Sequence, residues 1–276
     1  MSTTMSVRFW GVRGSIPCPG PGTVRYGGNT SCVEVRCGEH RLVFDAGSGL
    51  RMLGNALAAD PRLIDIDLFL SHCHIDHVIG LPFFTPAFAK GNRVHVWAGN
   101  VRRAGGVREA VGRLMSYPLF PIGVEAAQGT VAFVDFDPGE VLHPRHGIAV
   151  HTAALNHPGG ATGYRVEYGG RAMAYVTDLE LGGGATDPAL LALVRDASLV
   201  IIDATYTDAE LPDHVGWGHS SWQQVVRLAN EAGVAKLCLF HHDPDHDDAQ
   251  MDRIAAAAAT ARPGTLVARE GLVLDI

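Results

Sequence analysis

The chain has 276 residues, of which 47% are hydrophobic, so it is long and apolar enough to fill one sizeable core. Its formal net charge of −7 provides no overall positive field, which argues against a general nucleic-acid-binding protein. The five cysteines form no C-x-x-C pair, no apolar run reaches membrane-spanning length, and the start shows no signal-peptide pattern. We therefore expect a cytoplasmic protein with reduced thiols and no insertion in a membrane.

Hydrophobic alternation and periodicity predict strands and helices along the whole chain. The predicted strands are residues 6–10, 31–36, 40–45, 67–71, 93–97, 131–136, 147–155, 162–168, 171–177, 198–203, 235–240 and 265–268. The predicted helices are residues 49–58, 76–89, 104–116, 187–195, 220–232 and 247–261. This order indicates an α/β (α+β) protein with two β-rich layers and helices outside them. Since no internal repeat and no linker rich in Pro or Ser interrupts it, we expect residues 1–276 to form a single domain.

The most specific motif follows the predicted strand at residues 67–71, where His72, His74, Asp76 and His77 form the pattern H-x-H-x-D-H. His72 and His74 are two positions apart in an extended exit and project to the same side. Asp76 and His77 lie on the turn into the next helix and can face back toward them. Imidazole and carboxylate groups are ligands for zinc, iron and manganese, so this loop predicts a metal site.

Three later predicted strands also end in side chains that can bind metal, namely His157, Asp178 and His241. Two sites can be assembled: His72, His74 and His157 in one, Asp76, His77 and His241 in the other, with Asp178 bridging them. Two divalent ions about 3.5–4 Å apart share a water that becomes hydroxide near neutral pH. Taken alone, His157 could be a hydrogen-bonded loop histidine, and Asp178 could be a turn or helix-capping residue. Their joint placement favours the metal interpretation.

The order of these motifs resembles the metallo-β-lactamase superfamily: a strand ending in Asp45-Ala46-Gly47, then H-x-H-x-D-H, a lone His, a lone Asp and a terminal His. The resemblance implies a four-layer αββα sandwich with a dinuclear site at one edge of the sheets. It implies a metal-dependent hydrolase with two divalent ions, zinc first, with manganese or iron as alternatives. It also implies that Asp45 orients the histidine loop and does not bind metal. The superfamily has many substrates, so the fold does not settle which one is used.

Two further segments point to phosphoester chemistry. Residues 200–205 and 218–221 resemble the H-E-A-T and G-H-S-T segments of RNase Z-like phosphodiesterases, with Asp in place of Glu and an isoleucine in place of the first histidine. In that group the carboxylate orients a histidine, which contacts the scissile phosphate and can protonate the leaving oxygen. We therefore expect Asp203 and His219 to act in catalysis together with Asp76. The alternative is that Asp203 is a polar residue at the end of a strand and His219 a residue at the start of a helix, with no part in catalysis.

These patterns predict a phosphodiesterase that acts on small, cyclic phosphodiesters through a metal-bridging hydroxide. In RNase Z, the first alternative, an RNA-gripping arm lies between the lone-His and lone-Asp motifs. Here only twenty residues separate His157 from Asp178, and Gly169-Gly170 predicts a hairpin among them. We therefore expect a small-molecule substrate and no nucleic acid. A hydrolase of esters, thioesters or lactones and a non-catalytic binding protein on the same scaffold are the remaining alternatives.

Some residues are candidates for contacts outside the metal site. Arg13 and Asn29, in glycine-rich loops, are candidate phosphate contacts, with plain turn residues as the alternative. Trp217 and Trp222 are candidate rings for stacking on a base, with core packing as the alternative. Residues 105–128 are expected to form a lid over the site or the contact between two copies in a homodimer, with ordinary core packing as the alternative.

Overall fold

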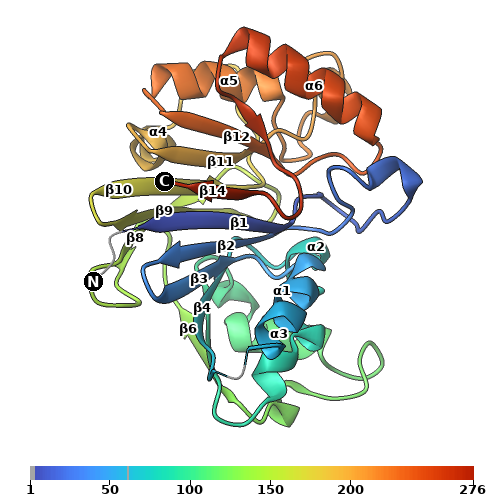
Figure 1. Cartoon of the computed structure of the whole chain (residues 1–276), viewed down its shortest axis with the longest axis vertical. Helices are drawn as coiled ribbons and strands as arrows, with labels where there is room; N and C mark the ends of the chain where they lie inside the picture. The colour runs from blue at the N-terminus through green and yellow to red at the C-terminus, as the bar shows by residue number, and fades with distance from the viewer. Residues whose placement is uncertain (1–3, 61) are drawn as a thin grey trace.

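The computed structural model describes residues 4–60 and 62–276, and over these residues it contains two seven-stranded sheets (Figure 1). The strand order in the first sheet is β14 (Val273–Asp275), β1 (Met5–Gly11), β2 (Cys32–Cys37), β3 (His40–Phe44), β4 (Asp65–Leu70), β5 (Arg93–Ala98) and β6 (Thr130–Asp135). The order in the second sheet is β13 (Leu266–Val267), β12 (Lys236–Phe240), β11 (Leu199–Asp203), β10 (Arg171–Val176), β9 (Ala161–Tyr168), β8 (Ala149–Leu155) and β7 (Val141–Leu142). The helices are α1 (Gly49–Ala58), α2 (Ile75–Val78), α3 (Val107–Leu114), α4 (Pro188–Val194), α5 (Trp222–Glu231) and α6 (Asp248–Ala261).

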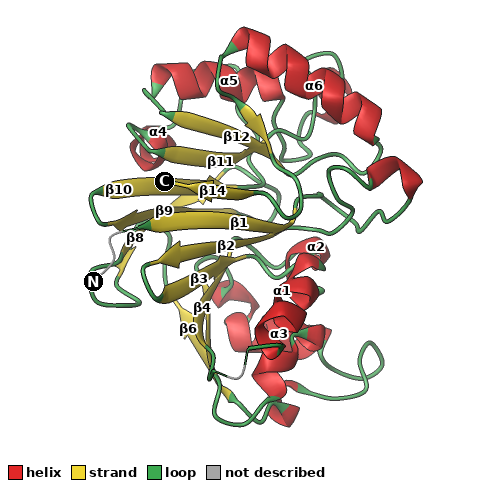
Figure 2. Cartoon of the chain, viewed as in Figure 1, coloured by secondary structure: helices red, strands yellow, loops and turns green. Residues whose placement is uncertain are grey.

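Helices lie on the two outer sides of the strands, which gives four layers (Figure 2). Three separate clusters of buried apolar side chains fill the spaces between layers. One lies under α4, α5 and α6, one under α1 and α3, and the third between the sheets. The third is rich in aromatic rings, including Phe44, Phe69, Tyr164 and Phe240. The predicted αββα sandwich is confirmed.

Strand β4 illustrates how the sequence builds these layers. Ile66, Leu68 and Leu70 belong to the cluster under α1 and α3, whereas Phe69 belongs to the cluster between the sheets. Side chains alternate between the two faces of a strand, and because both faces of β4 are buried along its second half, that half is the continuous apolar run Leu68-Phe69-Leu70. That run ends at Leu70, which leaves the metal-binding motif at the edge of the sheet.

The strands that precede the candidate ligands point the same way within each sheet. β3 runs parallel to β4, and β10, β11 and β12 are parallel to one another. β8 pairs antiparallel with β9, which pairs antiparallel with β10, so β8 has the direction of β10. Their carboxyl ends therefore meet at one edge of the molecule, and they carry Asp45, His72, His157, Asp178, Asp203 and His241.

One predicted helix is wrong in length. The segment predicted as a helix over 76–89 forms only the four-residue α2, followed by 3₁₀ turns at Leu81–Phe83 and Thr85–Phe88. Pro82 and Pro86 lie in these turns, and proline removes a backbone donor and clashes with the preceding turn of an α-helix. The spacing of apolar residues, on which the helix prediction rested, gave no sign that the helix ends after α2.

The short strands β7 and β14 were also not predicted, because two or three residues are too few to show an alternating pattern. The predicted hairpin is confirmed: Gly169 and Gly170 both have positive φ, and Tyr168 pairs with Arg171 across the turn. Among the helices that the structure describes, none combines the length and apolarity needed to cross a bilayer.

Candidate metal centre

Five histidines and two carboxylates of the candidate site converge from both sheets. His72 and His74 leave the end of β4, and Asp76 and His77 lie in α2, where Ser15 donates its backbone N–H to Asp76 Oδ2 at 2.8 Å. The loop folds back as the sequence predicted, since the His77 ring lies 4.3 Å from the His72 ring between centroids. The motif therefore presents its ligand atoms from a strand exit and a single helical turn.

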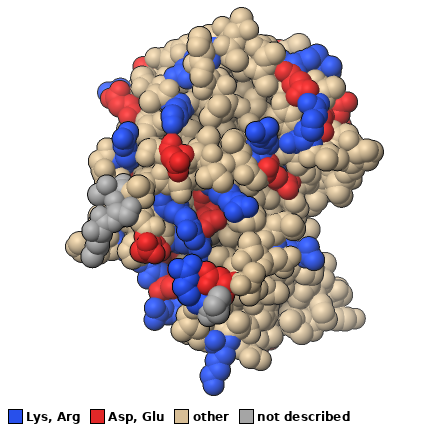
Figure 3. All heavy atoms as spheres, viewed as in Figure 1, with Lys and Arg blue, Asp and Glu red and all other residues tan. Residues whose placement is uncertain are grey.

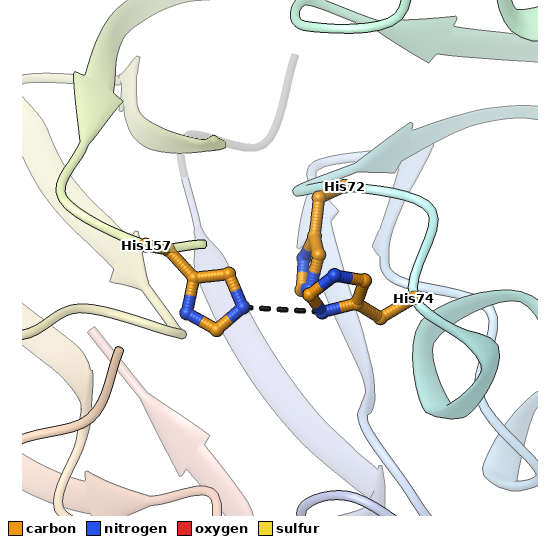
Figure 4. A group of neighbouring side chains, drawn as sticks. All are labelled: His72, His74 and His157. Carbon is orange, nitrogen blue, oxygen red and sulfur yellow. Dashed lines mark hydrogen bonds between the residues drawn. The ribbon is translucent and has the colours of Figure 1, made fainter. Parts of the chain in front are cut away.

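The first group consists of His72, His74 and His157, whose ligand atoms all lie within 4.8 Å of one another. Figure 4 shows His157 reaching from the end of β8 toward the two histidines of the β4 exit, with its Nε2 at 3.1 Å from His74 Nδ1. The His157 Nδ1–H donates to the carbonyl of Gly218 at 2.9 Å, which leaves Nε2 with a free lone pair. This is the form of imidazole that binds a metal ion.

The second group consists of Asp76, His77 and His241, and the ligand atoms of these residues also lie within 4.8 Å of one another. His241 follows β12 and adopts a positive φ of 59°, an uncommon conformation that turns it at the strand end. Its Nε2 lies 3.5 Å from Asp76 Oδ2.

Asp178 lies between the two groups, and its two carboxylate oxygens face different groups. Oδ1 is 3.8 Å from His72 Nε2 and 3.6 Å from His157 Nε2. Oδ2 is 3.2 Å from His77 Nε2 and 3.3 Å from His241 Nε2. This division of the oxygens allows the carboxylate to be shared by two ions.

Several of the candidate ligand nitrogens are buried and have no hydrogen-bond partner among the described residues, which fits the binding of divalent cations. The Nε2 atoms of His72, His77 and His241 are buried and make no hydrogen bond within the described chain, although carboxylate oxygens lie close by. Buried polar atoms without a partner are costly, so such a cluster needs a further partner. A divalent ion bound by nitrogen and oxygen donors supplies it.

The electrostatics point the same way. Burial favours the neutral form of Asp178, but the imidazoles of His241, His77 and His72 hold its pKa well below the ordinary value. Burial and the neighbouring His77 lower the pKa of His72 well below its usual range, so it is neutral, as a ligand must be. For His77, burial lowers the pKa, but the surrounding carboxylates, Asp178 first, raise it well above the ordinary value. The raised pKa of His77 shows that the carboxylates of Asp178 and Asp76 favour a positive charge at this place, which is also where a bound cation would lie.

Asp45 supports the centre without entering it. It is fully buried, and its Oδ2 accepts hydrogen bonds at 2.8 Å from His77 Nδ1, Ser71 Oγ and Tyr175 Oη. Its Oδ1 accepts the Ser71 backbone N–H at 2.7 Å. The carboxylate thereby fixes the orientation of the His77 ring and points its Nε2 at Asp178.

Asp203 and His219 form a second carboxylate–imidazole pair next to the ligands. The His219 Nδ1–H donates to Asp203 Oδ2 at 2.7 Å, and the His219 ring stacks on the His241 ring at 4.9 Å between centroids. Burial lowers the pKa of His219, but the Asp203 carboxylate outweighs it, and the pKa rises to about 9. Thr205, which sequence reasoning missed, joins this pair to the metal ligands, because its Oγ1 contacts both Asp203 Oδ1 and His241 Nδ1.

The two candidate phosphate contacts, Arg13 and Asn29, both make hydrogen bonds within the protein. Arg13 is buried and donates to the backbone carbonyls of Gly27, Asp243 and His246, so it holds loops together. Asn29 donates its side-chain N–H to Glu270. These contacts support the alternative interpretation of both residues.

The two candidate stacking residues, Trp217 and Trp222, differ in burial. Trp222 is 9% exposed and lies in the core cluster under α5, whereas Trp217 is 60% exposed beside the site.

In the predicted lid or dimer segment, Tyr117 and Leu119 are exposed and Phe120 packs against Phe83. The homodimer stays a prediction.

Residues 40–242 match the family profile of the β-lactamase superfamily domain, which is most of the chain. The chain belongs to this superfamily. Because the superfamily, its ribonuclease Z members and the geometry above agree, we describe the protein as a metal-dependent hydrolase.

The chain is similar to ribonuclease Z of Synechococcus sp. (strain CC9311), with 26% identity over 330 aligned positions that cover 99% of each chain. Among solved structures it is similar to YhfI from Bacillus subtilis (TM-score 0.73, 18% identity, 100% of both chains) and to the short form of human tRNase Z (TM-score 0.68, 20% identity, 98% of both). A diphosphatase of the PhnP family is a further neighbour (TM-score 0.70, 17% identity, 99% of this chain and 97% of that one). The ribonuclease Z relatives weigh against the prediction that nucleic acid is not a substrate.

We expect Asp45→Asn to weaken metal binding by about 10- to 100-fold, because the amide cannot accept all the hydrogen bonds that orient His77. Competition titration of zinc against a chromogenic chelator measures this affinity. Asp67→Asn is the matched control: Asp67 is equally buried but accepts from Trp97 and Arg145 in the body of β4. Equal zinc affinities for the two variants would show that Asp45 does not support the centre.

Proposed function

We propose that the protein is a dinuclear phosphodiesterase that hydrolyses small, cyclic phosphodiesters. The observation that carries this proposal is the Asp203–His219 pair, placed next to a complete set of metal ligands. Hydrolysis of an ester, thioester or lactone has no clear use for a second, carboxylate-oriented histidine at this position.

We assign seven residues to hold two ions: His72, His74 and His157 for one, Asp76, His77 and His241 for the other, and Asp178 for both. When bound, such ions polarise the substrate oxygens and lower the pKa of a shared water. Zinc is the first choice because the donor set is rich in imidazole, and manganese and iron are the alternatives. Asp76 belongs to the catalytic set as a ligand that faces the reacting groups.

His219 is assigned to the leaving group. Its Nδ1 is occupied by Asp203, so Nε2 is the nitrogen that can carry a proton to the departing oxygen. Asp203 in turn is fixed by the backbone N–H groups of Leu179 and Thr205 and by the Thr205 hydroxyl. Asp203 is thus a positioning residue that sets both the tautomer and the direction of the His219 ring.

The surroundings of the centre favour a small substrate. The loops that follow β3, β4, β8, β10, β11 and β12, at residues 45–48, 71–74, 156–160, 177–187, 204–221 and 241–247, contain no Lys or Arg. Elsewhere, on the face shown in Figure 3, basic side chains are scattered among acidic and uncharged ones. Binding of a polynucleotide depends on cations that neutralise its phosphates, and these loops offer none.

Ribonuclease Z-like processing of tRNA is the second candidate function, favoured by the named relatives. Two features oppose it. The alignment with the Synechococcus enzyme runs over 330 positions, more than this chain has residues, so that enzyme carries segments that this chain lacks. The region between His157 and Asp178 is occupied by the β9–β10 hairpin, with no room for an inserted arm.

We expect His219→Ala to lower kcat for a 2′,3′-cyclic nucleotide by about 10²- to 10⁴-fold without changing metal content, because a general acid is lost. The loss should be smaller for bis(p-nitrophenyl) phosphate, whose leaving group departs as a stable anion. His151→Ala is the control, since His151 lies on β8 in an exposed ion pair with Glu167. Elemental analysis accompanies the kinetics. Full activity in the variant, or loss of its metals, would refute the assigned role.

We also expect kcat/KM to be higher for 2′,3′- or 3′,5′-cyclic nucleotides than for a 3′-extended tRNA in the same buffer. The reason is that the ligand-bearing loops contain no cationic side chain to hold the RNA backbone. Faster cleavage of the tRNA, with tight binding that falls steeply as salt rises, would instead establish the processing nuclease.

A further inference from the structure

Exposed apolar side chains lie close in the sequence to residues of the metal centre. Ile16, Ile75 and Trp217 are all more than half exposed, Ile16 and Trp217 on loops and Ile75 at the start of α2. Ile16 follows Ser15, which donates to Asp76, and Ile75 lies between two candidate ligands. Exposed apolar side chains near a polar, metal-binding centre suit a substrate whose reacting phosphate carries an uncharged, hydrophobic group.

The loop that carries Trp217 is held firmly against the centre. Glu180 accepts the backbone N–H groups of Gly216 and Gly218, at 2.9 and 2.8 Å, on both sides of the tryptophan. The Gly218 carbonyl accepts from His157 Nδ1, and a Cβ at position 218 would lie 2.3 Å from that nitrogen. Trp217 is therefore one residue away from a direct contact with a candidate metal ligand.

The indole ring itself belongs to a row of aromatic rings that ends at the candidate general acid. Trp217 meets the His214 ring edge-on at 4.8 Å, His214 stacks on Tyr206 at 4.2 Å, and Tyr206 meets the His219 ring edge-on at 6.0 Å. Tyr206 and His219 are buried, whereas Trp217 at the other end of the row is exposed to solvent. Its indole ring therefore offers surface on which a ligand could stack.

We propose that Trp217 is a stacking platform for a planar ring carried by the substrate, such as a nucleobase, and that it selects nucleoside phosphodiesters over alkyl ones. The inference rests on the proposed phosphodiesterase function and adds the substrate class. With no Lys or Arg in the ligand-bearing loops, the exposed indole ring is a source of affinity beyond the metal centre that needs no cationic side chain. Stacking of a base on an aromatic side chain is tolerant of base identity and changes affinity by about 10- to 100-fold.

The test compares two strained cyclic phosphates that differ in the base: 2′,3′-cyclic AMP and glycerol 1,2-cyclic phosphate. Trp217→Ala should raise KM for 2′,3′-cyclic AMP by about 10- to 100-fold with little change in kcat, and Trp217→Phe should restore most of the loss. KM for glycerol cyclic phosphate should change little. Leu63→Ala, which removes an exposed apolar side chain ahead of β4 at the opposite edge, is the control and should alter neither.

A second readout does not depend on turnover. Binding of 5′-AMP to the zinc-loaded protein should quench tryptophan fluorescence, and Trp217→Phe should abolish that quenching. If neither cyclic phosphate is hydrolysed but the quenching is present, the platform stands and the phosphodiesterase function fails. An equal loss for both substrates in Trp217→Ala, unchanged KM for both, or absent quenching would overturn the platform. A fall in sedimentation mass in Trp217→Ala, with KM unchanged, would overturn it in favour of an interface between two copies.

Discussion

The Asp178 carboxylate is buried, and each of its oxygens faces two imidazoles that come from different loops. Removing such a group from water costs several kcal/mol unless charge and hydrogen bonds compensate it. The compensation here comes from imidazoles that follow three strands, β4 in one sheet and β8 and β12 in the other, so the packing of the two sheets and the geometry of the centre cannot vary independently. The cluster of buried aromatic and aliphatic side chains between the sheets fills that space and holds the sheets together.

Carboxylates at strand ends serve the centre in two ways. Asp178 faces the histidines directly, whereas Asp45 and Asp203 each fix one histidine from behind, His77 and His219 respectively. Asp45 and Asp178 both adopt a positive φ, near 60°. This conformation is uncommon except for Gly, Asn and Asp, and it lets the chain turn sharply while the carboxylate stays buried. The same type of residue thereby supplies a ligand, an orienting partner and a turn.

Much of this arrangement was readable from the sequence, because each ligand follows an apolar strand and the H-x-H-x-D-H motif is local. The order of motifs predicted the four-layer sandwich, and the structure brings all seven candidate ligands together. Contacts between residues far apart in sequence were not predictable: the Ser15 backbone on Asp76 and the Thr205 hydroxyl on His241 leave no pattern in the sequence. The helix predicted over 76–89 was wrong for a local reason: the apolar spacing was followed and the two prolines that end the helix were not taken into account. Trp217 and Trp222 looked equivalent in sequence, and only packing separated the exposed ring from the buried one.

Anomalous diffraction at the zinc edge, from crystals of the reconstituted protein, tests the central claim most directly. The account predicts two peaks about 3.5–4 Å apart at the carboxyl-end edge of the sheets. One should be bound by His72, His74 and His157, the other by Asp76, His77 and His241, with one oxygen of Asp178 on each. A single peak, peaks away from these residues, or no metal after reconstitution with zinc, manganese or iron would contradict it.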